Sequence, residues 1–504
     1  MWRLIDASTL GGDAASPRYE QIAGAIVSAI QAGRLRTGDR LPTVRGLAAD
    51  LKVSVTTVHA AFRSLSDDGW IRGEIGRGTF VAKAAESVAP ATGSPDPFNG
   101  RRWTGVKSPW RSRARAHSAE RLRSAFPDAV DCSTGRPDPS LLPLKLLRRH
   151  WKSALDGLEE AELQYRTADP TPELEAALLP RLASDGIPAE AAGLVVGSSA
   201  QQLIGLAADV SARLWGRREP VIAVEQPGYC TIFDTWDRAG VRMIGVQTDE
   251  HGARPDSLAD AIERGANTAL FTPRALNPTG ASWSVERRQA LADVLTRHPR
   301  VLVVEDDHFG DISVERPGSL LDDERLERQV IYVRSFSKSI APDLRLAVAA
   351  AHSPARALLR DAKSHADGWT SRLLQRVLAR LLSDQSLNSW LERARDQYRL
   401  RRQRAMETIA TLAPAGVSTW AGRDGVNLWI HLPPAVEATD VLERAAALGV
   451  LVAPGEPFYL GPGHEDVLRF NAGSVDTNKV AACAKLLVQA IQQCQGTHST
   501  MIHV

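Results

Sequence analysis

The clearest indication of fold class lies in residues 301–307, which read Val301-Leu302-Val303-Val304-Glu305-Asp306-Asp307. Four apolar residues follow one another without alternation, and three carboxylates end the run. A strand with one face in water alternates apolar and polar residues, whereas a strand buried on both faces is apolar throughout. The stretch therefore predicts a strand of a parallel sheet between helices, with acidic side chains at its carboxyl end.

Four further runs have the same character and are separated by helical segments. They are residues 194–196, 221–224, 269–271 and 331–333. Together the five runs predict an α/β body that extends from about residue 127 to residue 504. Functional groups in such folds collect just beyond the carboxyl ends of the strands. The polar residues that follow each run are therefore the candidates for a site.

These candidates form an ordered set along the chain. In order they are Ser198, Ser199 and Ala200 at the start of a helix, Tyr229, Asn277 in N-P-T-G, Asp306, and finally Ser335, Ser337, Lys338 and Arg345. Taken singly, each has an ordinary explanation, such as a helix cap, a turn or a surface charge. Their shared position after buried strands favours one common site.

The set provides what the cofactor pyridoxal 5′-phosphate requires. Lys338 would form a Schiff base with the aldehyde, and Asp306 would keep the pyridine nitrogen protonated. Asn277 would bind the ring hydroxyl, and Tyr229 would stack on the ring. The phosphate would lie on exposed helix amides, hydroxyl groups and a bidentate arginine, contributed by Ser198, Ser199, Ala200, Ser335, Ser337 and Arg345.

Residues 1–83 predict a separate helical head that ends in a hairpin. Apolar residues recur at helical spacing from Tyr19 to Ile30, from Val44 to Leu51 and from Val58 to Leu65. Thr43 and Ser54 stand where caps for the second and third helices belong. Short strands at 70–71 and 79–81 around a glycine-containing turn complete a winged helix-turn-helix.

The third helix of the head has a polar outer face suited to DNA. Hydroxyl groups and a guanidinium on such a face can contact phosphates and base edges. The candidates are Ser54, Thr56, Thr57, His59 and Arg63 on this helix, with Arg45 on the second helix and Arg77 at the wing tip. A small helical domain with a solvated polar face is the alternative, and the wing counts against it.

Charge and composition agree with this division. The chain has 504 residues and a net charge of +2, but residues 1–126 carry +8 and the remainder −6, which suggests a polyanionic partner for the head. Solubility would explain the asymmetry about as well. Residues 84–126 are rich in arginine, proline and glycine and predict a basic flexible linker. The four cysteines lack metal-site spacing, and we find no signal peptide or membrane span, so a cytoplasmic location is expected and no metal is predicted.

Both parts resemble known families. The head, with G-R-L-R-T-G-D-R-L-P-T-V-R-G-L-A-A-D-L, V-S-V-T-T-V and G-R-G-T-F-V, resembles the GntR-type winged helix. The body resembles fold-type-I aminotransferases over roughly 370 residues, through G-S-S-A-Q-Q, E-Q-P-G-Y, N-P-T-G, V-V-E-D-D and S-F-S-K-S-I-A-P-D-L-R-L. The combination is the layout of MocR-type transcription regulators, and T-G-R-P-D-P-S-L-L-P resembles their entry into the body.

The resemblance implies more than the residues alone do. It implies a smaller α+β C-terminal domain, a homodimer, and a double-stranded DNA operator as partner. Arg469, in V-L-R-F-N-A-G, would grip the carboxylate of an effector, and Tyr165 would reach the phosphate in the partner subunit. The effector would be pyridoxal phosphate itself, or an amine or amino acid that reacts with it. E-D-D-H-F and R-A-L-N-P-T-G resemble a MocR subgroup linked to vitamin B6 metabolism.

The chain departs from these families at three positions. His308 replaces the tyrosine that usually binds the ring hydroxyl of the cofactor, which argues against efficient transamination. Val55 and His59 stand where GntR-type helices often carry arginines, so base specificity cannot be transferred. Two alternatives stay open at this point: a genuine aminotransferase with an accessory DNA-binding head, and a regulator whose body is a scaffold without cofactor.

Overall fold

The computed structural model describes residues 18–31, 35, 38–67, 70–74, 78–82, 121–216, 219–461 and 464–501. The chain divides into two compact units. Residues 1–99 contain the predicted head, and residues 100–504 contain the predicted body. Within the described residues, no helix combines the length and apolar character needed to cross a membrane.

The head is a winged helix-turn-helix. Its elements are α1 (Arg18–Gln31), α2 (Val44–Leu51), α3 (Val55–Asp67), β1 (Ile71–Glu74) and β2 (Gly78–Val81). Thr43 accepts a hydrogen bond from the Gly46 amide and caps α2, and Ser54 accepts one from the Thr57 amide at the start of α3. The strands pair antiparallel, with Ile71 opposite Val81. The predicted apolar faces form one core that includes Ile22, Leu47 and Val58, so the predicted fold of the head is confirmed.

The body is built on an eight-stranded sheet with the order β4-β11-β10-β9-β8-β5-β6-β7. The strands are β4 (Leu194–Gly197), β5 (Val221–Gln226), β6 (Arg242–Asp249), β7 (Gly252–Ala253), β8 (Thr268–Phe271), β9 (Leu302–Asp307), β10 (Val330–Ser335) and β11 (Ala347–Ala351). Neighbours from β10 to β6 are parallel, while β11 pairs antiparallel with β10 and β4. All five runs predicted as buried strands are strands here. The prediction lacked β6, β7 and β11.

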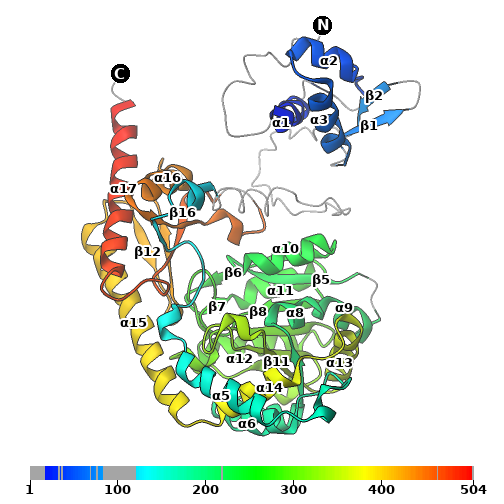
Figure 1. Cartoon of the computed structure of the whole chain (residues 1–504), viewed down its shortest axis with the longest axis vertical. Helices are drawn as coiled ribbons and strands as arrows, with labels where there is room; N and C mark the ends of the chain where they lie inside the picture. The colour runs from blue at the N-terminus through cyan, green and yellow to red at the C-terminus, as the bar shows by residue number, and fades with distance from the viewer. Residues whose placement is uncertain are drawn as a thin grey trace. The chain divides into compact units, whose positions relative to one another are not determined.

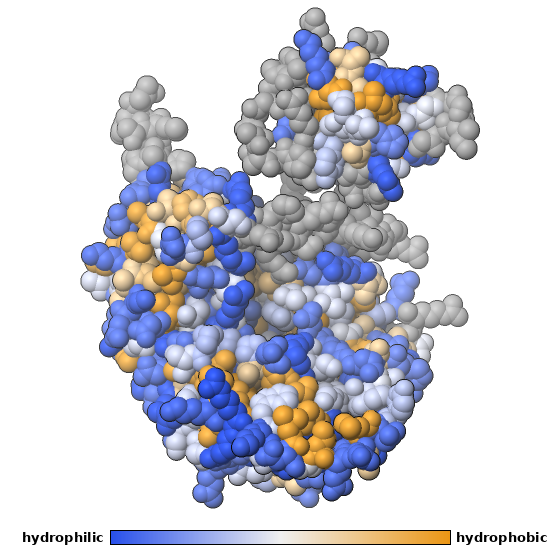
Figure 2. Space-filling view, in the orientation of Figure 1, coloured by the Kyte–Doolittle hydropathy of each residue, from blue (hydrophilic) through white to orange (hydrophobic). Residues whose placement is uncertain are grey.

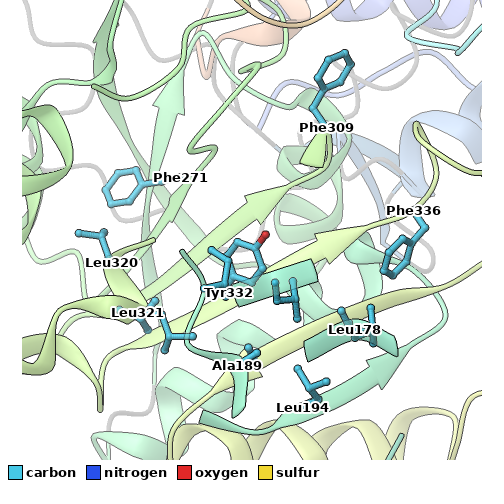
Figure 3. Packing of buried hydrophobic residues seen from close by; sticks show 14 of the residues in the cluster. Leu178, Ala189, Leu194, Phe271, Phe309, Leu320, Leu321, Tyr332 and Phe336 are labelled. Atoms are coloured by element: carbon cyan, nitrogen blue, oxygen red, sulfur yellow. The ribbon is translucent and has the colours of Figure 1, made fainter. Parts of the chain in front are cut away.

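Helices pack on the sheet and account for the uniformly apolar strands (Figure 1). They are α5 (Leu144–Asp156), α6 (Pro172–Ser184), α7 (Ala189–Ala192), α8 (Ala200–Gly205), α9 (Ala207–Leu214), α10 (Cys230–Arg238), α11 (Pro255–Glu263), α12 (Val285–Thr296), α13 (Ala355–Ala366) and α14 (Arg372–Leu382). Every residue of β4, β8, β9, β10 and β11 is buried. Figure 3 shows this core around Tyr332, with Leu178, Leu194 and Phe336 nearby.

A smaller α+β domain completes the body, as predicted. Its antiparallel sheet has the order β12-β13-β16-β15, from β12 (Ser418–Trp420), β13 (Asn427–His431), β15 (Ala453–Pro454) and β16 (Val467–Asn471). The long α15 (Ser386–Leu412) runs from the large domain to this one, and α16 (Ala438–Leu448) and α17 (Val480–Met501) cover it (Figure 1). A short parallel pair joins β3 (Val130–Asp131) to β14 (Val450–Leu451).

The end of the predicted linker packs against the small domain. Residues 121–125 are helical, and Leu122 is buried in the core of the small domain with Phe126 packed against it. These apolar contacts explain why residues 121–126 fold with the body, although the arginines around them predicted a tether. Residues 83–120 lie outside the described part of the chain.

Candidate functional site

A cavity of about 650 Å³ lies at the carboxyl ends of the parallel strands and is closed by the small domain. Most of the body residues predicted for the site line this one cavity. They are Ser199, Ala200, Tyr229, Asn277, Asp306, His308, Ser335, Ser337, Lys338, Arg345 and Arg469. Six strands, β4, β5, β8, β9, β10 and β16, or the segments that follow them therefore contribute to a single site.

Asp306 is a buried carboxylate in the wall of the cavity, and one of its oxygen atoms has no hydrogen-bond partner among the described residues. It is 5% exposed, and its Oδ1 atom is buried without a hydrogen bond from any described residue. Burial and the charge of Asp307 raise its pKa to about 7, although Lys338 acts in the opposite direction. A protonated ring nitrogen would supply both the hydrogen bond and the charge that this carboxylate lacks. The residue therefore fits the pyridine end of the cofactor.

Lys338 follows β10 and contributes the amine of the cavity. Burial and the charge of Arg469 lower its pKa to about 8, while Asp306 raises it. Its Nζ atom donates a hydrogen bond to the carbonyl of Gly135. A lysine with a lowered pKa carries more of the neutral amine near neutral pH, and the neutral amine is the nucleophile toward an aldehyde.

This pKa predicts the pH dependence of cofactor uptake. The rate at which the apoprotein takes up pyridoxal phosphate should rise with pH and level off above about pH 8, because the neutral fraction of Lys338 rises through its pKa. Stopped-flow absorbance across pH 6–11 measures it. A rate that keeps rising to pH 10, as for an ordinary lysine, would contradict the lowered pKa.

Asn277 and Arg469 meet at the small-domain side of the cavity. The Asn277 Oδ1 atom accepts hydrogen bonds from Arg469 Nη1 at 3.1 Å and from Asn427 Nδ2 at 3.2 Å. Its Nδ2 is therefore the atom suited to donate to a ring hydroxyl. Arg469, on β16, is 6% exposed, lies 4.8 Å above the Phe458 ring and donates to the carbonyl of Ser133. A buried guanidinium in a cavity wall suits a carboxylate ligand.

The opposite end of the cavity suits a phosphate. Ser199 caps α8 by accepting from the Gln202 amide at 3.1 Å, so Ala200 and Gln201 line the cavity at the first turn of this helix. Ser335 and Ser337 come from the end of β10. Arg345 has φ = 52°, a left-handed conformation that costs an ordinary residue about 1–3 kcal/mol and is concentrated at functional sites.

His308 lies two residues beyond Asp306 at the end of β9. Burial and the charge of Lys338 lower its pKa to about 4, so its imidazole is neutral near pH 7. A neutral imidazole can donate one hydrogen bond and accept another. Tyr229 lines the cavity where β5 leads into α10.

Two of the predicted body residues do not line the cavity. The Ser198 hydroxyl donates to Asp367 at 3.0 Å, and its amide donates to the Gln202 side chain at 2.8 Å. The Tyr165 side chain is 86% exposed and makes an edge-to-face contact with Trp369. Tyr165 therefore does not line the cavity of this chain.

The residues 133–136 line the cavity but were not assigned to it from the sequence. They follow β3 and include Ser133 and Gly135, whose carbonyls accept from Arg469 and Lys338. Asn427 on β13, which holds Asn277, was also missed. The T-G-R-P-D-P motif was the available signal for the first group, because two prolines beside a glycine predict an extended segment whose carbonyls have no partners within a helix or sheet.

A buried ion network lies beneath the site on the other side of β9. Asp307 accepts from Arg274 at 2.9 and 2.6 Å, from Arg334 at 2.8 Å and from the Tyr332 hydroxyl. Both arginines also donate to Asp185, at 2.9 and 2.6 Å. The two arginines hold the pKa of Asp307 far below its usual range despite complete burial. This network fixes the segments that carry Asn277, Asp306 and Lys338.

The predicted DNA-contacting residues that the structure describes lie on α2, on α3 or immediately before α3. Arg45, Ser54, Thr56, His59 and Arg63 are exposed, and Thr57 is half-buried. The Ser54 hydroxyl is 2.7 Å from the hydroxyls of Thr56 and Thr57. Arg77 lies outside the described residues.

Comparison with known families agrees with both parts. Residues 18–81 match the family described as bacterial regulatory proteins, gntR family, and residues 138–486 match the family described as aminotransferase class I and II. The α-aminoadipate aminotransferase LysN from Thermus thermophilus, solved with N-(5′-phosphopyridoxyl)-L-leucine, superposes with a TM-score of 0.66 at 26% identity, covering 77% of this chain and 99% of that one. Fold and cavity thus define an aminotransferase-type body with a GntR-type head.

Relatives with both parts are regulators. The vitamin B6 salvage pathway transcriptional repressor PtsJ of Salmonella typhimurium is 31% identical over 92% of this chain and 96% of its own length. The regulator TauR of Rhodobacter capsulatus is 30% identical over 86% and 88%. The chain therefore belongs to the family of GntR-type regulators with a class I and II aminotransferase domain, the MocR type.

Proposed function

We propose that the protein is a DNA-binding transcription regulator that holds pyridoxal phosphate at Lys338 and responds to the cofactor or to an amine that reacts with it. Residues 1–83 act as the DNA-binding domain and residues 127–504 as the cofactor and dimerisation domain. The residues between them join the two domains, with 121–126 packed on the body.

One observation carries the cofactor assignment. In a single cavity, the buried Oδ1 atom of Asp306 has no partner among the described residues, and the amine of Lys338 and the guanidinium of Arg345 line the same cavity. Leaving a buried charged group unpaired is costly, so a scaffold body would have no reason to retain it. When bound, the cofactor supplies an electrophilic carbonyl for amines. The chain supplies the amine of Lys338, an acceptor at Asp306 and an anion site at Arg469.

The proposal includes a homodimer. Leu144, Leu155 and Leu163 are 52%, 52% and 70% exposed, and Tyr165 follows them along the chain. Figure 2 shows apolar side chains at the surface of the lower part of the body, where α5 and α6 lie in Figure 1. Burial of these residues against a second copy would cover them and carry Tyr165 toward the partner's cavity.

A cytoplasmic location fits the four free cysteines.

The DNA-binding part is tested by selection from a random pool of duplexes. The full chain, with and without pyridoxal phosphate, should enrich a motif with two half-sites separated by whole turns of the double helix, because a dimer presents two recognition helices. A cofactor-dependent change in affinity for that motif supports a sensor. Affinity for DNA that ignores sequence would contradict the proposal.

Arg63→Ala tests the assignment of α3 as the recognition helix. Arg63 is exposed on this helix, so its loss should weaken binding to the selected duplex about tenfold or more. Fluorescence anisotropy at fixed salt measures the change. Arg238→Ala, an exposed arginine at the end of α10 in the body, is the control and should leave affinity unchanged. Equal effects of the two variants would exclude α3 from the interface.

A further inference from the structure

The cavity is lined by more positively charged side chains than are needed to bind the cofactor and one carboxylate of an effector. Its lining contains a single carboxylate, Asp306, against five cationic residues: Arg123, Arg136, Lys338, Arg345 and Arg469. The proposed function assigns the last three to the aldehyde, the phosphate and the effector carboxylate. Arg123 and Arg136 are left without an assigned ligand.

Arg123 is incompletely satisfied by the protein. Its side chain is 38% exposed, and its buried Nε atom donates no hydrogen bond to a described residue. Asp131 Oδ2 lies 3.5 Å from that atom, and Ser133 Oγ lies 3.5 Å from Nη2. Asp131 instead accepts closer bonds from Ser133, at 2.9 Å from the amide and 2.6 Å from the hydroxyl. A guanidinium this loosely held retains capacity for a stronger anionic partner.

Arg136 stands on the same side of the cavity. Its carbonyl accepts from Asn471 at 3.4 Å, and its exposed side chain lines the cavity. Ser133 links this region to Arg469, because its hydroxyl faces Arg123 and its carbonyl accepts from Arg469. Gly135 lies close as well, since a Cβ there would be 3.9 Å from Arg469 Nη1. Arg123 and Arg469 therefore both contact the segment 133–136, which also contains Arg136.

We propose that Arg123 and Arg136 form a second anion subsite beside Arg469, and that the effector is an amine with two anionic groups. One carboxylate binds Arg469, and a second carboxylate or a phosphate monoester binds Arg123 and Arg136. This inference rests on the proposed function. A neutral side chain would leave Arg123 with only its 3.5 Å contacts to Asp131 and Ser133, and Arg136 with no partner among the described residues, in a cavity whose other walls include Leu442, Val452 and Phe458.

Titration of the cofactor-loaded full chain with matched pairs of amino acids tests the proposal. L-glutamate is compared with L-glutamine, and O-phospho-L-serine with L-serine, by the change in cofactor absorbance. We expect the anionic member of at least one pair to bind about tenfold or more tightly, since charged hydrogen bonds contribute more than neutral ones. The pair that shows the preference distinguishes a carboxylate from a phosphate ligand.

The double variant Arg123→Gln/Arg136→Gln should abolish that preference, because it weakens binding of the anionic member more than binding of the neutral one. Arg121→Gln is the matched control: it lies on the same segment, is 61% exposed, pairs with Glu443 and does not line the cavity. The inference would be overturned if the wild type bound the charged and neutral members equally or responded to neither. It would also be overturned if the preference survived in the double variant. Failure of the wild type to acquire cofactor absorbance would instead overturn the proposed function.

Discussion

We expect Lys338→Ala to abolish the visible absorbance that the wild-type chain should acquire with pyridoxal phosphate. The Lys338 amine, lining the cavity with a pKa lowered to about 8, is the group placed to react with the aldehyde. Asp306 and Arg345 still offer contacts to the ring and the phosphate, so the variant keeps weak binding that dialysis removes. Borohydride treatment, followed by peptide mass spectrometry, should label the peptide that contains Lys338 in the wild type and no peptide in the variant.

The same variant separates the proposed sensor from a scaffold body. Its DNA affinity should no longer respond to added pyridoxal phosphate, because a ligand that is not held cannot favour one arrangement of the chain. Lys485→Ala, an exposed lysine on α17, is the control and should behave as wild type. If Lys338→Ala retains the absorbance, or regulates DNA binding like the wild type, the assignment of Lys338 is wrong.

The parts of the fold that could be read from the sequence are those with a local signal. Strands β4, β5, β8, β9 and β10 each contain an uninterrupted apolar run because both faces are covered, and that pattern is visible in the sequence alone. β6 begins with an arginine and is only partly buried, so it lacks the pattern. β11 is nearly all alanine, which gives little strand propensity, and only its position between β4 and β10 fixes it as a strand.

The same distinction applies to the site. Asp306, Asn277 and Lys338 could be placed because each follows a strand, and parallel strands bring their ends together. Arg123 and Asn427 could not, because they reach the cavity only through the packing of the small domain. Ser198 was placed in the site because it precedes Ser199, which does line the cavity. Its hydroxyl instead donates to Asp367, which lies 169 residues away in the sequence and could not be foreseen from the local pattern.

Arg274→Met should lower the free energy of unfolding of the body by about 3–5 kcal/mol, the usual cost of removing one partner from a buried ion pair. Arg274 is 2% exposed and donates to both Asp307 and Asp185, so its loss leaves Asp307 with Arg334 as its only arginine, while Asp185 keeps Arg334 and Arg316. Methionine fills much of the volume, which separates the loss of charge from the loss of packing. The shift of the midpoint in urea unfolding measures the effect.

The same substitution should also change the pH dependence of cofactor binding. With Asp307 less compensated, its negative charge raises the pKa of neighbouring Asp306 further above about 7, so the carboxylate is less ionised near neutral pH and the pH range of cofactor binding moves upward. Arg254→Met removes an exposed pair with Asp256 and should cost less than about 1 kcal/mol with no effect on cofactor binding. A midpoint shift no larger than that of the control would show that the network contributes little to stability. An unchanged pH profile with a large midpoint shift would confine Arg274 to a structural role, because only the electrostatic link to Asp306 moves the profile.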